Sequence, residues 1–318
     1  MSGELIHRLS HTAEVAAPAH VAYTLIADPE RWPLFLPRNV YAQRLDFDGT
    51  RERLRMWVLA EGQITSWTSQ RVQDPARRRI TFRQDLLMAP ATSMAGVWSV
   101  QALDAGRCLL RLEHEFTTAQ ERPQDQAWLT EVVTANSRSA LDSLRFLAER
   151  WPRLDQLALS FAESVRVKGP AELVYNFLYE IADWPGQLPH VRRVALEEPH
   201  VGIQKVALDL ATADGGEAAV AGIRICFPHA GRIVHKATVP RPLLAAHCGE
   251  WSVLPDEHGV TVVSQHHALL REDTVEQILG PGTGLDQARR TVRADLTRES
   301  RQILQLARRH AESAVRTL

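Results

Sequence analysis

The 318-residue sequence has few of the features that usually identify a class of protein at a glance. It contains only three cysteines, Cys108, Cys226 and Cys248. Their odd number and wide spacing fit neither a disulfide framework nor a Cys-x-x-Cys metal or redox site, so we expect a reducing, cytoplasmic location. Basic residues number 37 and acidic residues 38, for a net charge of -1. No overall field therefore favours nucleic acid as a partner.

Long hydrophobic runs are also missing. The first residues, MSGELIHRLSHTAEV, contain no apolar core of a signal peptide, and no apolar run approaches the ~18 residues that a membrane span needs. The sequence has no glycine-rich phosphate loop, no Gly-x-Ser-x-Gly turn and no His-x-x-x-His pair on an expected helix. We therefore expect a soluble protein that has no membrane partner, no metal and no cofactor.

What the sequence does contain is an internal repeat. ERWPLFLP at residues 30–37 recurs as ADWPGQLP at residues 182–189. The repeat also pairs Val15 with Val167, Tyr23 with Tyr175, Arg71 with Arg224, Trp98 with Trp251 and His114 with His267. A period of about 150 residues is too long for a solenoid, whose units run roughly 20–50 residues. We expect two globular domains, residues 1–152 and 153–318, each large enough for its own core.

Each half has the same order of structural signals. A short strand precedes a proline-initiated helix, which leads through Trp-Pro into alternating strands and then a long helix. In the first half we expect a split helix within residues 18–36, six meandering strands within 40–118 and a long helix near 124–150. Helices segregated from antiparallel strands are typical of an α+β fold, with the long helix lying across the sheet.

Strand alternation predicts polar side chains between the sheet and the long helix. Trp67, Ser69 and Arg71 share one strand face, and His114 lies on an otherwise apolar face. Met94 and Trp98 share the inner face of another strand, and Asn136 falls within the apolar stripe of the long helix. Buried polar groups cost roughly 1–3 kcal/mol unless they are paired. These groups therefore either satisfy one another or line a wet pocket.

Each of these residues also has a purely structural interpretation. Arg71 could reach solvent at a strand end, and Trp67 and Trp98 could be core residues. Asn136 could hydrogen-bond another helix, and His114 could be a satisfied core histidine. A pocket is favoured only because all these side chains are expected to face the same space between the sheet and the long helix.

The motifs together resemble a known family. They are Pro-Ala-x-Val-x-Tyr, then Trp-Pro, Trp-Thr-Ser-x-Arg, Asp-Pro-x-x-Arg-Arg, Met-x-x-x-Trp and Asn-Ser-Arg. Over essentially the whole chain the sequence resembles the didomain polyketide aromatase/cyclases of bacterial type II polyketide synthases. The resemblance implies two tandem helix-grip domains, as in START and Bet v 1 proteins, in which a curved antiparallel sheet grips a long helix around a pocket.

The resemblance also implies a substrate and partners. The substrate would be a ketoreduced poly-β-ketone tethered to an acyl carrier protein, whose first ring is closed and dehydrated. The ketoreductase and ketosynthase of the same pathway would be further partners. The pocket positions of the family fall on Trp32, Trp67, Ser69, Arg71, Met94, Trp98 and Asn136.

The second half keeps only part of this pocket pattern. Trp184, Arg224, Trp251 and His267 remain, whereas Val220, Gly222 and Glu299 stand where the first half has Trp67, Ser69 and Asn136. We therefore expect the first domain to carry the dehydration. The second domain would contribute mainly structure or chain handling.

A mechanism can be assigned to the first pocket. Arg71 would stabilise the enolate oxygen, and Ser69 would orient a carbonyl, hydroxyl or water. His114, whose unperturbed pKa is roughly 6.5, would move the proton, and a water held by Ser69 and Asn136 is the rival. We expect Arg71→Ala to keep the fold and lose the aromatised product. The alternatives are a START-like binder of hydrophobic ligands and a chaperone or assembly protein without chemistry of its own.

Overall fold

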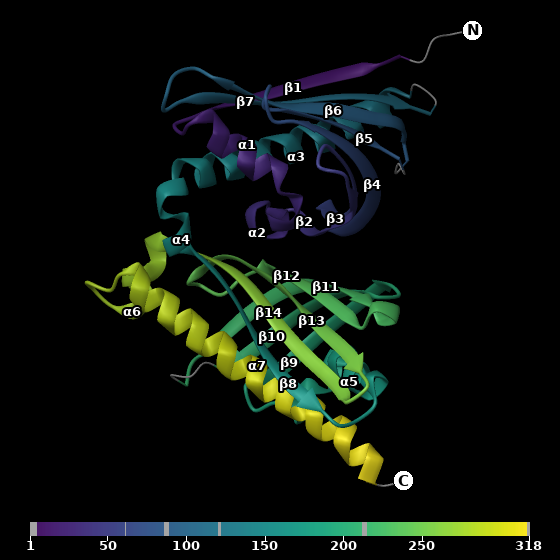
Figure 1. Ribbon diagram of the computed structural model, residues 1–318, viewed down its shortest axis with the longest axis vertical. Helices are drawn as coiled ribbons and strands as arrows, with labels where there is room; N and C mark the ends of the chain where they lie inside the picture. The colour runs from purple at the N-terminus through teal and green to yellow at the C-terminus, as the bar shows by residue number, and fades with distance from the viewer. Residues whose placement is uncertain (1–4, 61, 86–88, 120–121, 212–214, 317–318) are drawn as a thin grey trace. The chain divides into compact units, whose positions relative to one another are not determined.

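The computed structural model describes residues 5–316, apart from 61, 86–88, 120–121 and 212–214. The chain divides into two compact units, Met1–Leu154 and Asp155–Leu318. Each unit contains one seven-stranded antiparallel sheet and a long helix at its carboxyl end (Figure 1). The tandem α+β helix-grip fold expected from the sequence is confirmed.

The first unit follows the expected order of elements. Its strands are β1 (His7–Val15), β2 (Asn39–Phe47), β3 (Arg51–Ala60), β4 (Gln63–Asp74), β5 (Arg79–Gln84), β6 (Ala91–Ala102) and β7 (Cys108–Thr118). Its helices are α1 (Ala19–Ala27), η1 (Pro29–Arg31), α2 (Trp32–Phe35) and α3 (Pro123–Glu149). Pro29 and Pro33 split the first helix because proline is tolerated only in the first turn of a helix. The β2–β7 meander and the closing helix match the expectation.

The second unit repeats this order. After η2 (Trp151–Arg153) and α4 (Leu154–Leu157), its strands are β8 (Ala158–Val167), β9 (Val191–His200), β10 (Ile203–Ala211), β11 (Glu217–Phe227), β12 (Arg232–Val239), β13 (Leu244–Asp256) and β14 (Gly259–Leu270). Its helices are α5 (Ala171–Tyr179), η3 (Ile181–Gly186), η4 (Pro228–Ala230), η5 (Glu272–Thr274), α6 (Val275–Leu279) and α7 (Leu285–Arg316). The strand order is β1-β7-β6-β5-β4-β3-β2 in the first sheet and β8-β14-β13-β12-β11-β10-β9 in the second.

The strand registers correct one correspondence between the halves. His114 lies opposite Gly96 in the first sheet, and His266 lies opposite Gly249 in the second. The β13–β14 hairpin is one residue shorter than the β6–β7 hairpin, so the counterpart of His114 is His266. The prediction that His267 lines the second pocket is wrong, because adjacent strand residues point to opposite faces. His267 instead contacts the hydroxyl of Ser160, with 2.7 Å between Nδ1 and Oγ.

The core of the first unit lies between the sheet and α3. The apolar stripe of α3 buries Leu129, Val133, Leu141, Leu144 and Leu147. From the sheet, Leu110, Leu112 and Phe116 of β7 are buried on the same side. Asn136 and Ser137 interrupt this stripe near the middle of α3. The polar part of the interior therefore lies against the middle of the helix.

Candidate active site

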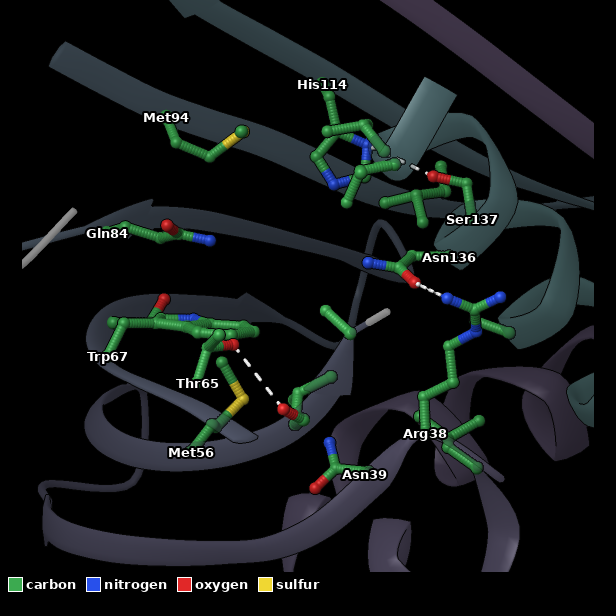
Figure 2. A pocket seen from close by; sticks show the side chains of 18 of the residues that line it. Arg38, Asn39, Met56, Thr65, Trp67, Gln84, Met94, His114, Asn136 and Ser137 are labelled. Carbon is green, nitrogen blue, oxygen red and sulfur yellow. Dashed lines mark hydrogen bonds between the residues drawn. The ribbon is translucent and has the colours of Figure 1, made fainter. Parts of the chain in front are cut away.

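A cavity of about 240 Å³ lies between the sheet and the helices of the first unit. Figure 2 shows side chains from several strands and from α3 converging on it. The structure places all eight candidate residues of the first domain around this one cavity: Trp32, Trp67, Ser69, Arg71, Met94, Trp98, His114 and Asn136. Alternating strands and one helix face thus bring together residues that are far apart in the sequence.

Two glycine positions let aromatic or imidazole rings lie flat against the sheet. A Cβ atom at Gly96 would lie 2.2 Å from the carbonyl oxygen of Glu113 and 2.4 Å from Cζ of Phe82. At Gly249 it would lie 2.0 Å from the carbonyl oxygen of Gln265. At position 96, only glycine leaves the space that the Phe82 ring occupies in the wall of the first cavity.

Tryptophans form much of the apolar wall. Trp32 and Trp98 are buried, and the Trp32 indole donates a hydrogen bond to the carbonyl of Leu25, at 3.2 Å. The Trp67 indole nitrogen is buried and has no hydrogen-bond partner among the residues that the structure describes. A buried indole N–H normally finds an acceptor. In this cavity the acceptor would be an atom of a ligand or a water.

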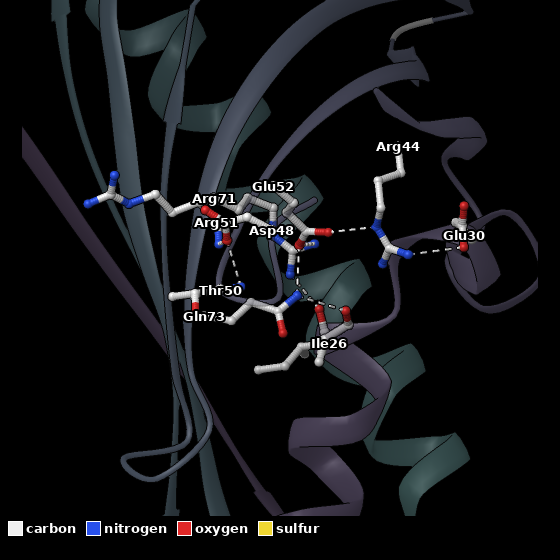
Figure 3. Close-up of polar contacts among 10 residues, drawn as sticks. Ile26, Glu30, Arg44, Asp48, Thr50, Arg51, Glu52, Arg71 and Gln73 are labelled. Carbon is white, nitrogen blue, oxygen red and sulfur yellow. Dashed lines mark hydrogen bonds and ion pairs between the residues drawn. The ribbon is translucent and has the colours of Figure 1, made fainter. Parts of the chain in front are cut away.

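Arg71 lines the cavity and is only 2% exposed. Its Nη2 donates to the carbonyl of Ile26 at 2.7 Å, and its Nη1 lies 2.9 Å from Oε1 of Glu52 (Figure 3). The guanidinium carbon lies 4.8 Å from the centre of the Trp32 ring. The interpretation in which Arg71 reaches solvent is therefore wrong. The guanidinium closes the carboxyl end of α1, where unpaired carbonyls favour a cation.

Glu52 was missed by the sequence analysis. Its carboxylate is fully buried and also contacts Arg44 Nε at 3.0 Å and Gln73 Nε2 at 2.9 Å. Glu52 lies directly opposite Arg71 in the β3–β4 ladder. Alternation along β3 places Glu52 on the same face as Leu54 and Met56, and this pattern could have revealed an inward-facing carboxylate. Its partner is the arginine on the neighbouring strand.

The Arg71 side chain retains hydrogen-bonding capacity after these contacts. Burial lowers the pKa of its guanidinium to about 10, although Glu52 acts in the opposite direction, so the group stays charged near neutral pH. Nε has no hydrogen-bond acceptor in the described part of the chain, and Nη1 is engaged only by the Glu52 carboxylate. A guanidinium offers five N–H donors. Arg71 therefore can hold the scaffold with some donors and present others to a ligand oxygen.

His114 is a neutral imidazole at neutral pH. Burial, followed by the charge of His11, lowers the pKa of His114 to about 4. Its Nδ1 lies 3.5 Å from the hydroxyl of Ser137, and its ring packs edge-on against Phe82 with centroids 5.4 Å apart. Ser137, which follows Asn136 on α3, was not identified from the sequence. A neutral imidazole beside a hydroxyl can both accept and donate a proton.

Ser69 and Asn136 each have one protein partner. The Ser69 hydroxyl donates to the carbonyl of Arg83 at 3.2 Å. Oδ1 of Asn136 accepts a hydrogen bond from Nη1 of Arg38 at 2.8 Å. The lone pairs of Ser69 and the amide nitrogen of Asn136 remain for a ligand. Arg38 lines the same cavity but had no distinguishing signal in the sequence.

The second unit has a smaller cavity of about 160 Å³, which Trp184, Arg224, Trp251 and Glu299 help to line. Arg224 repeats the role of Arg71, because it donates to the carbonyl of Leu178 and lies 6.0 Å from the Trp184 ring. Its Nη1 contacts Oε1 of Gln204 at 2.6 Å, where the first unit has a carboxylate.

Glu299 is not a free base in the second cavity. Its carboxylate accepts two hydrogen bonds from Arg241, at 2.9 and 2.5 Å. Val220 and Gly222 also line this cavity, at the positions of Trp67 and Ser69. The second unit therefore keeps the arginine and tryptophan frame but has different polar groups.

Among the described residues, no group of three His, Cys, Asp or Glu side chains is placed to hold a metal ion. No helix within the described ranges is both long and apolar enough to cross a membrane.

The sequence of this chain matches a known protein family and several of its members. Residues 7–149 match the family described as polyketide cyclase / dehydrase and lipid transport. The granaticin polyketide synthase bifunctional cyclase/dehydratase of Streptomyces violaceoruber is 34% identical over 98% of this chain and 95% of its own length. The actinorhodin polyketide synthase bifunctional cyclase/dehydratase of Streptomyces coelicolor is 35% identical over 97% and 96%.

Solved structures agree in fold and domain number. The di-domain aromatase/cyclase BexL superposes with a TM-score of 0.87 at 36% identity, covering 96% of this chain and 99% of BexL. The di-domain StfQ from the steffimycin pathway superposes at 0.85 with 29% identity and the same coverage. The fold and cavities thus define a tandem helix-grip protein of the aromatase/cyclase class. The chain belongs to the polyketide cyclase/dehydrase family, with the two-domain bifunctional cyclase/dehydratases as its full-length relatives.

Proposed function

We propose that this protein is an aromatase/cyclase that acts on a ketoreduced poly-β-ketone tethered to an acyl carrier protein. The first cavity would hold the chain while its first ring closes and loses water. The observation that carries this proposal is a cavity with aromatic walls that Arg71 and Trp67 line, with Nε of Arg71 and the indole nitrogen of Trp67 buried without a hydrogen-bond partner among the described residues. The names of the full-length relatives support the same reaction class.

Arg71 stabilises the enolate in this proposal. Ring closure and dehydration both begin when a proton leaves a carbon beside a carbonyl, and negative charge then develops on the carbonyl oxygen. Fixed donors in a water-poor site stabilise such charge without reorganising. The contacts of Arg71 with Glu52 and the Ile26 carbonyl hold its guanidinium in place. The remaining N–H groups are therefore preorganised for an oxygen.

His114 is the proton acceptor in this proposal. Its low pKa keeps the imidazole unprotonated at neutral pH, and Ser137 lies beside its Nδ1. The rival is a water held by Ser69 and Asn136. In that rival the water would be held by the lone pairs of Ser69 and the amide nitrogen of Asn136, because the Ser69 proton is given to the Arg83 carbonyl and the Asn136 oxygen accepts from Arg38. A neutral imidazole needs no such arrangement to accept a proton.

The aromatic wall would govern which carbons meet. Flat rings from Trp67 and Trp98 offer stacking surfaces to a nascent aromatic ring. They also exclude water from the reacting chain. The acyl carrier protein would deliver the chain, and the ketoreductase and ketosynthase of the same pathway would be its neighbours in biosynthesis.

Reconstitution tests this proposal. A minimal synthase with its carrier protein and a ketoreductase would be incubated with and without this protein, and the products compared by mass spectrometry. We expect aromatised first-ring product only when the protein is present. Unchanged products would contradict the enzymatic role. Tight binding of the chain without any change in products would favour a ligand binder, and products restored by cavity-blocked protein would favour an assembly role.

A further inference from the structure

Three histidines on the strands around the second cavity stand where the first cavity has only one, and His190 also lines the second cavity. His235 occupies the register position of Phe82, opposite Arg224 and Gly249 as Phe82 lies opposite Arg71 and Gly96. His247 corresponds to Met94, and His266 to His114. All three histidines line the cavity. The same scaffold thus accepts apolar side chains in one unit and imidazoles in the other.

These groups form a connected chain of hydrogen bonds. Nε2 of His247 lies 3.0 Å from Nδ1 of His266, and Nε2 of His266 lies 2.6 Å from the hydroxyl of Ser300. The hydroxyl of Ser264 lies 3.1 Å from the same His266 nitrogen. The His235 ring packs edge-on against His247, with centroids 5.4 Å apart. Two strands and the long helix α7 therefore contribute to one polar line through the cavity.

Of this line of hydrogen bonds, the first unit has only the contact between a serine and one histidine. Ser137 takes the place of Ser300, but its hydroxyl lies 3.5 Å from the imidazole, compared with 2.6 Å in the second unit. The neighbouring Met94 has no proton to exchange. The tight contacts of the second cavity are therefore specific to its own side chains.

The protonation states of the three histidines favour a proton relay, because neutral imidazoles carry no permanent positive charge. Burial lowers the pKa of His235 to about 3 and that of His266 to about 4, and it lowers the pKa of His247 well below the usual value. Arg224 and Arg241 act in the same direction on these histidines. Each neutral imidazole has one N–H donor and one lone pair. A proton gained at one end can thus be passed along the line.

A purely structural role explains these residues poorly. Phe82 and Met94 show that apolar side chains can occupy the corresponding positions. Imidazoles there carry a desolvation cost that phenylalanine and methionine avoid. A metal site is also disfavoured, because the facing nitrogens of His247 and His266 are within hydrogen-bond distance and leave no room for a cation between them.

We propose that the second cavity is a separate acid–base site, in which His247, His266 and Ser300 relay protons during dehydration of a cyclic β-hydroxy ketone. The choice of substrate class rests on the function proposed above. His235 and Trp251 complete its wall. This proposal assigns chemistry to a unit for which the sequence predicted mainly structure or chain handling.

The step is a balanced elimination. His247 accepts the proton as the bond between hydrogen and the α-carbon breaks, and the electron pair forms the new carbon–carbon double bond. The β-carbon–oxygen bond breaks, and the relay returns one proton to the departing hydroxide. The products are an enone and one water, and the relay is restored. No oxidant, reductant or cofactor is consumed.

A small probe tests this site without a synthase or carrier protein. The full chain would be incubated with 3-hydroxycyclohexanone, and formation of cyclohexenone followed by its ultraviolet absorption. Exchange of the α-protons in heavy water would be followed by NMR. The main variant is His235→Phe with His247→Met, which introduces the side chains of the first cavity. Ser300→Ala, which removes a single oxygen, covers the case in which the double variant does not fold.

The control variant lies outside the cavity. His267→Gln changes the neighbour of His266, and the His267 side chain contacts Ser160 instead. We expect the double variant to lower the rate about 100-fold, within the range for general acid–base catalysis, and Ser300→Ala to lower it less. His267→Gln should stay within about twofold of wild type, since it removes no member of the relay.

Two results would overturn the proposal. One is a wild-type rate with folded Ser300→Ala and folded double variant, and the other is no turnover or exchange by the wild-type chain above buffer. Because the probe needs no polyketide, the second site can fail while the reconstituted aromatase reaction succeeds, and the reverse is equally visible.

Discussion

Removal of the Arg71 side chain should destabilise the first unit strongly. The side chain of Arg71 is 2% exposed and that of Glu52 is 0% exposed. Arg71→Ala would leave the Glu52 carboxylate with the partly exposed Arg44 as its remaining ion-pair partner and would leave the Ile26 carbonyl without its donor. Breaking a buried pair on one side costs about 3–5 kcal/mol. The sequence-based expectation that Arg71→Ala keeps its stability is therefore replaced by a large loss.

A double-mutant cycle tests the magnitude. Glu52→Gln removes the charge and keeps a hydrogen-bond acceptor, as Gln204 does beside Arg224 in the second unit. Adding Glu52→Gln to Arg71→Ala should recover about 2 kcal/mol, because no buried carboxylate is then left behind; coupling of 0.5–3 kcal/mol is typical of contacting groups. Arg224→Ala with Gln204→Ala is the matched control, and we expect its coupling to be smaller because Gln204 carries no charge.

The assay is urea unfolding followed by tryptophan fluorescence and circular dichroism. Equal stability of wild type and Arg71→Ala would refute the buried-pair argument. Strict additivity of Arg71→Ala and Glu52→Gln would show that the two groups do not interact in solution. Either outcome would also remove the reason for regarding the Arg71 guanidinium as preorganised.

Two further predictions concern stability. Because the pKa of His114 and of His266 is lowered to about 4 from a usual 6.5, the unfolded chain takes up protons at a higher pH than the folded chain. The contribution of these two histidines to stability should thus be constant above pH 6.5 and fall between 6.5 and 4; thermal melting across this range would show it, and a melting temperature that does not change between pH 6.5 and 4 would contradict it. Gly96→Ala should lower stability by about 1–3 kcal/mol through overpacking, since its Cβ would lie 2.2 Å from the Glu113 oxygen. Denaturant unfolding measures this loss, and an unchanged midpoint would contradict it.

The architecture could be predicted from the sequence because it depends on repeated local signals. Prolines at helix starts, two-residue alternation and helix periodicity each report on one element, and the duplicated Trp-Pro segment reports on domain number. The same alternation predicted that Trp67, Ser69 and Arg71 point inward. The structure places them together in the cavity wall.

Contacts across the fold were harder to predict. Glu52 was missed because a glutamate in a charged strand usually faces solvent, and only the register shows it opposite Arg71. His267 was preferred to His266 because the repeat was extended through a hairpin that is one residue shorter. Arg38 and Ser137 reach the site through tertiary geometry alone. The hydrogen-bonded line of His247, His266 and Ser300 in the second cavity likewise depends on two separate strands and one helix.

The most direct test of the central claim compares two variants in the reconstituted synthase. Glu52→Gln keeps the Arg71 guanidinium, whereas Glu52→Gln with Arg71→Met removes the guanidinium without leaving a buried unpaired carboxylate. Loss of an oxyanion donor typically lowers a rate by about 100- to 1,000-fold. We predict that folded Glu52→Gln protein still yields aromatised first-ring product and that the folded double variant releases unaromatised shunt products. Aromatised product from both variants in equal amount would contradict the assignment of Arg71 and of the first cavity.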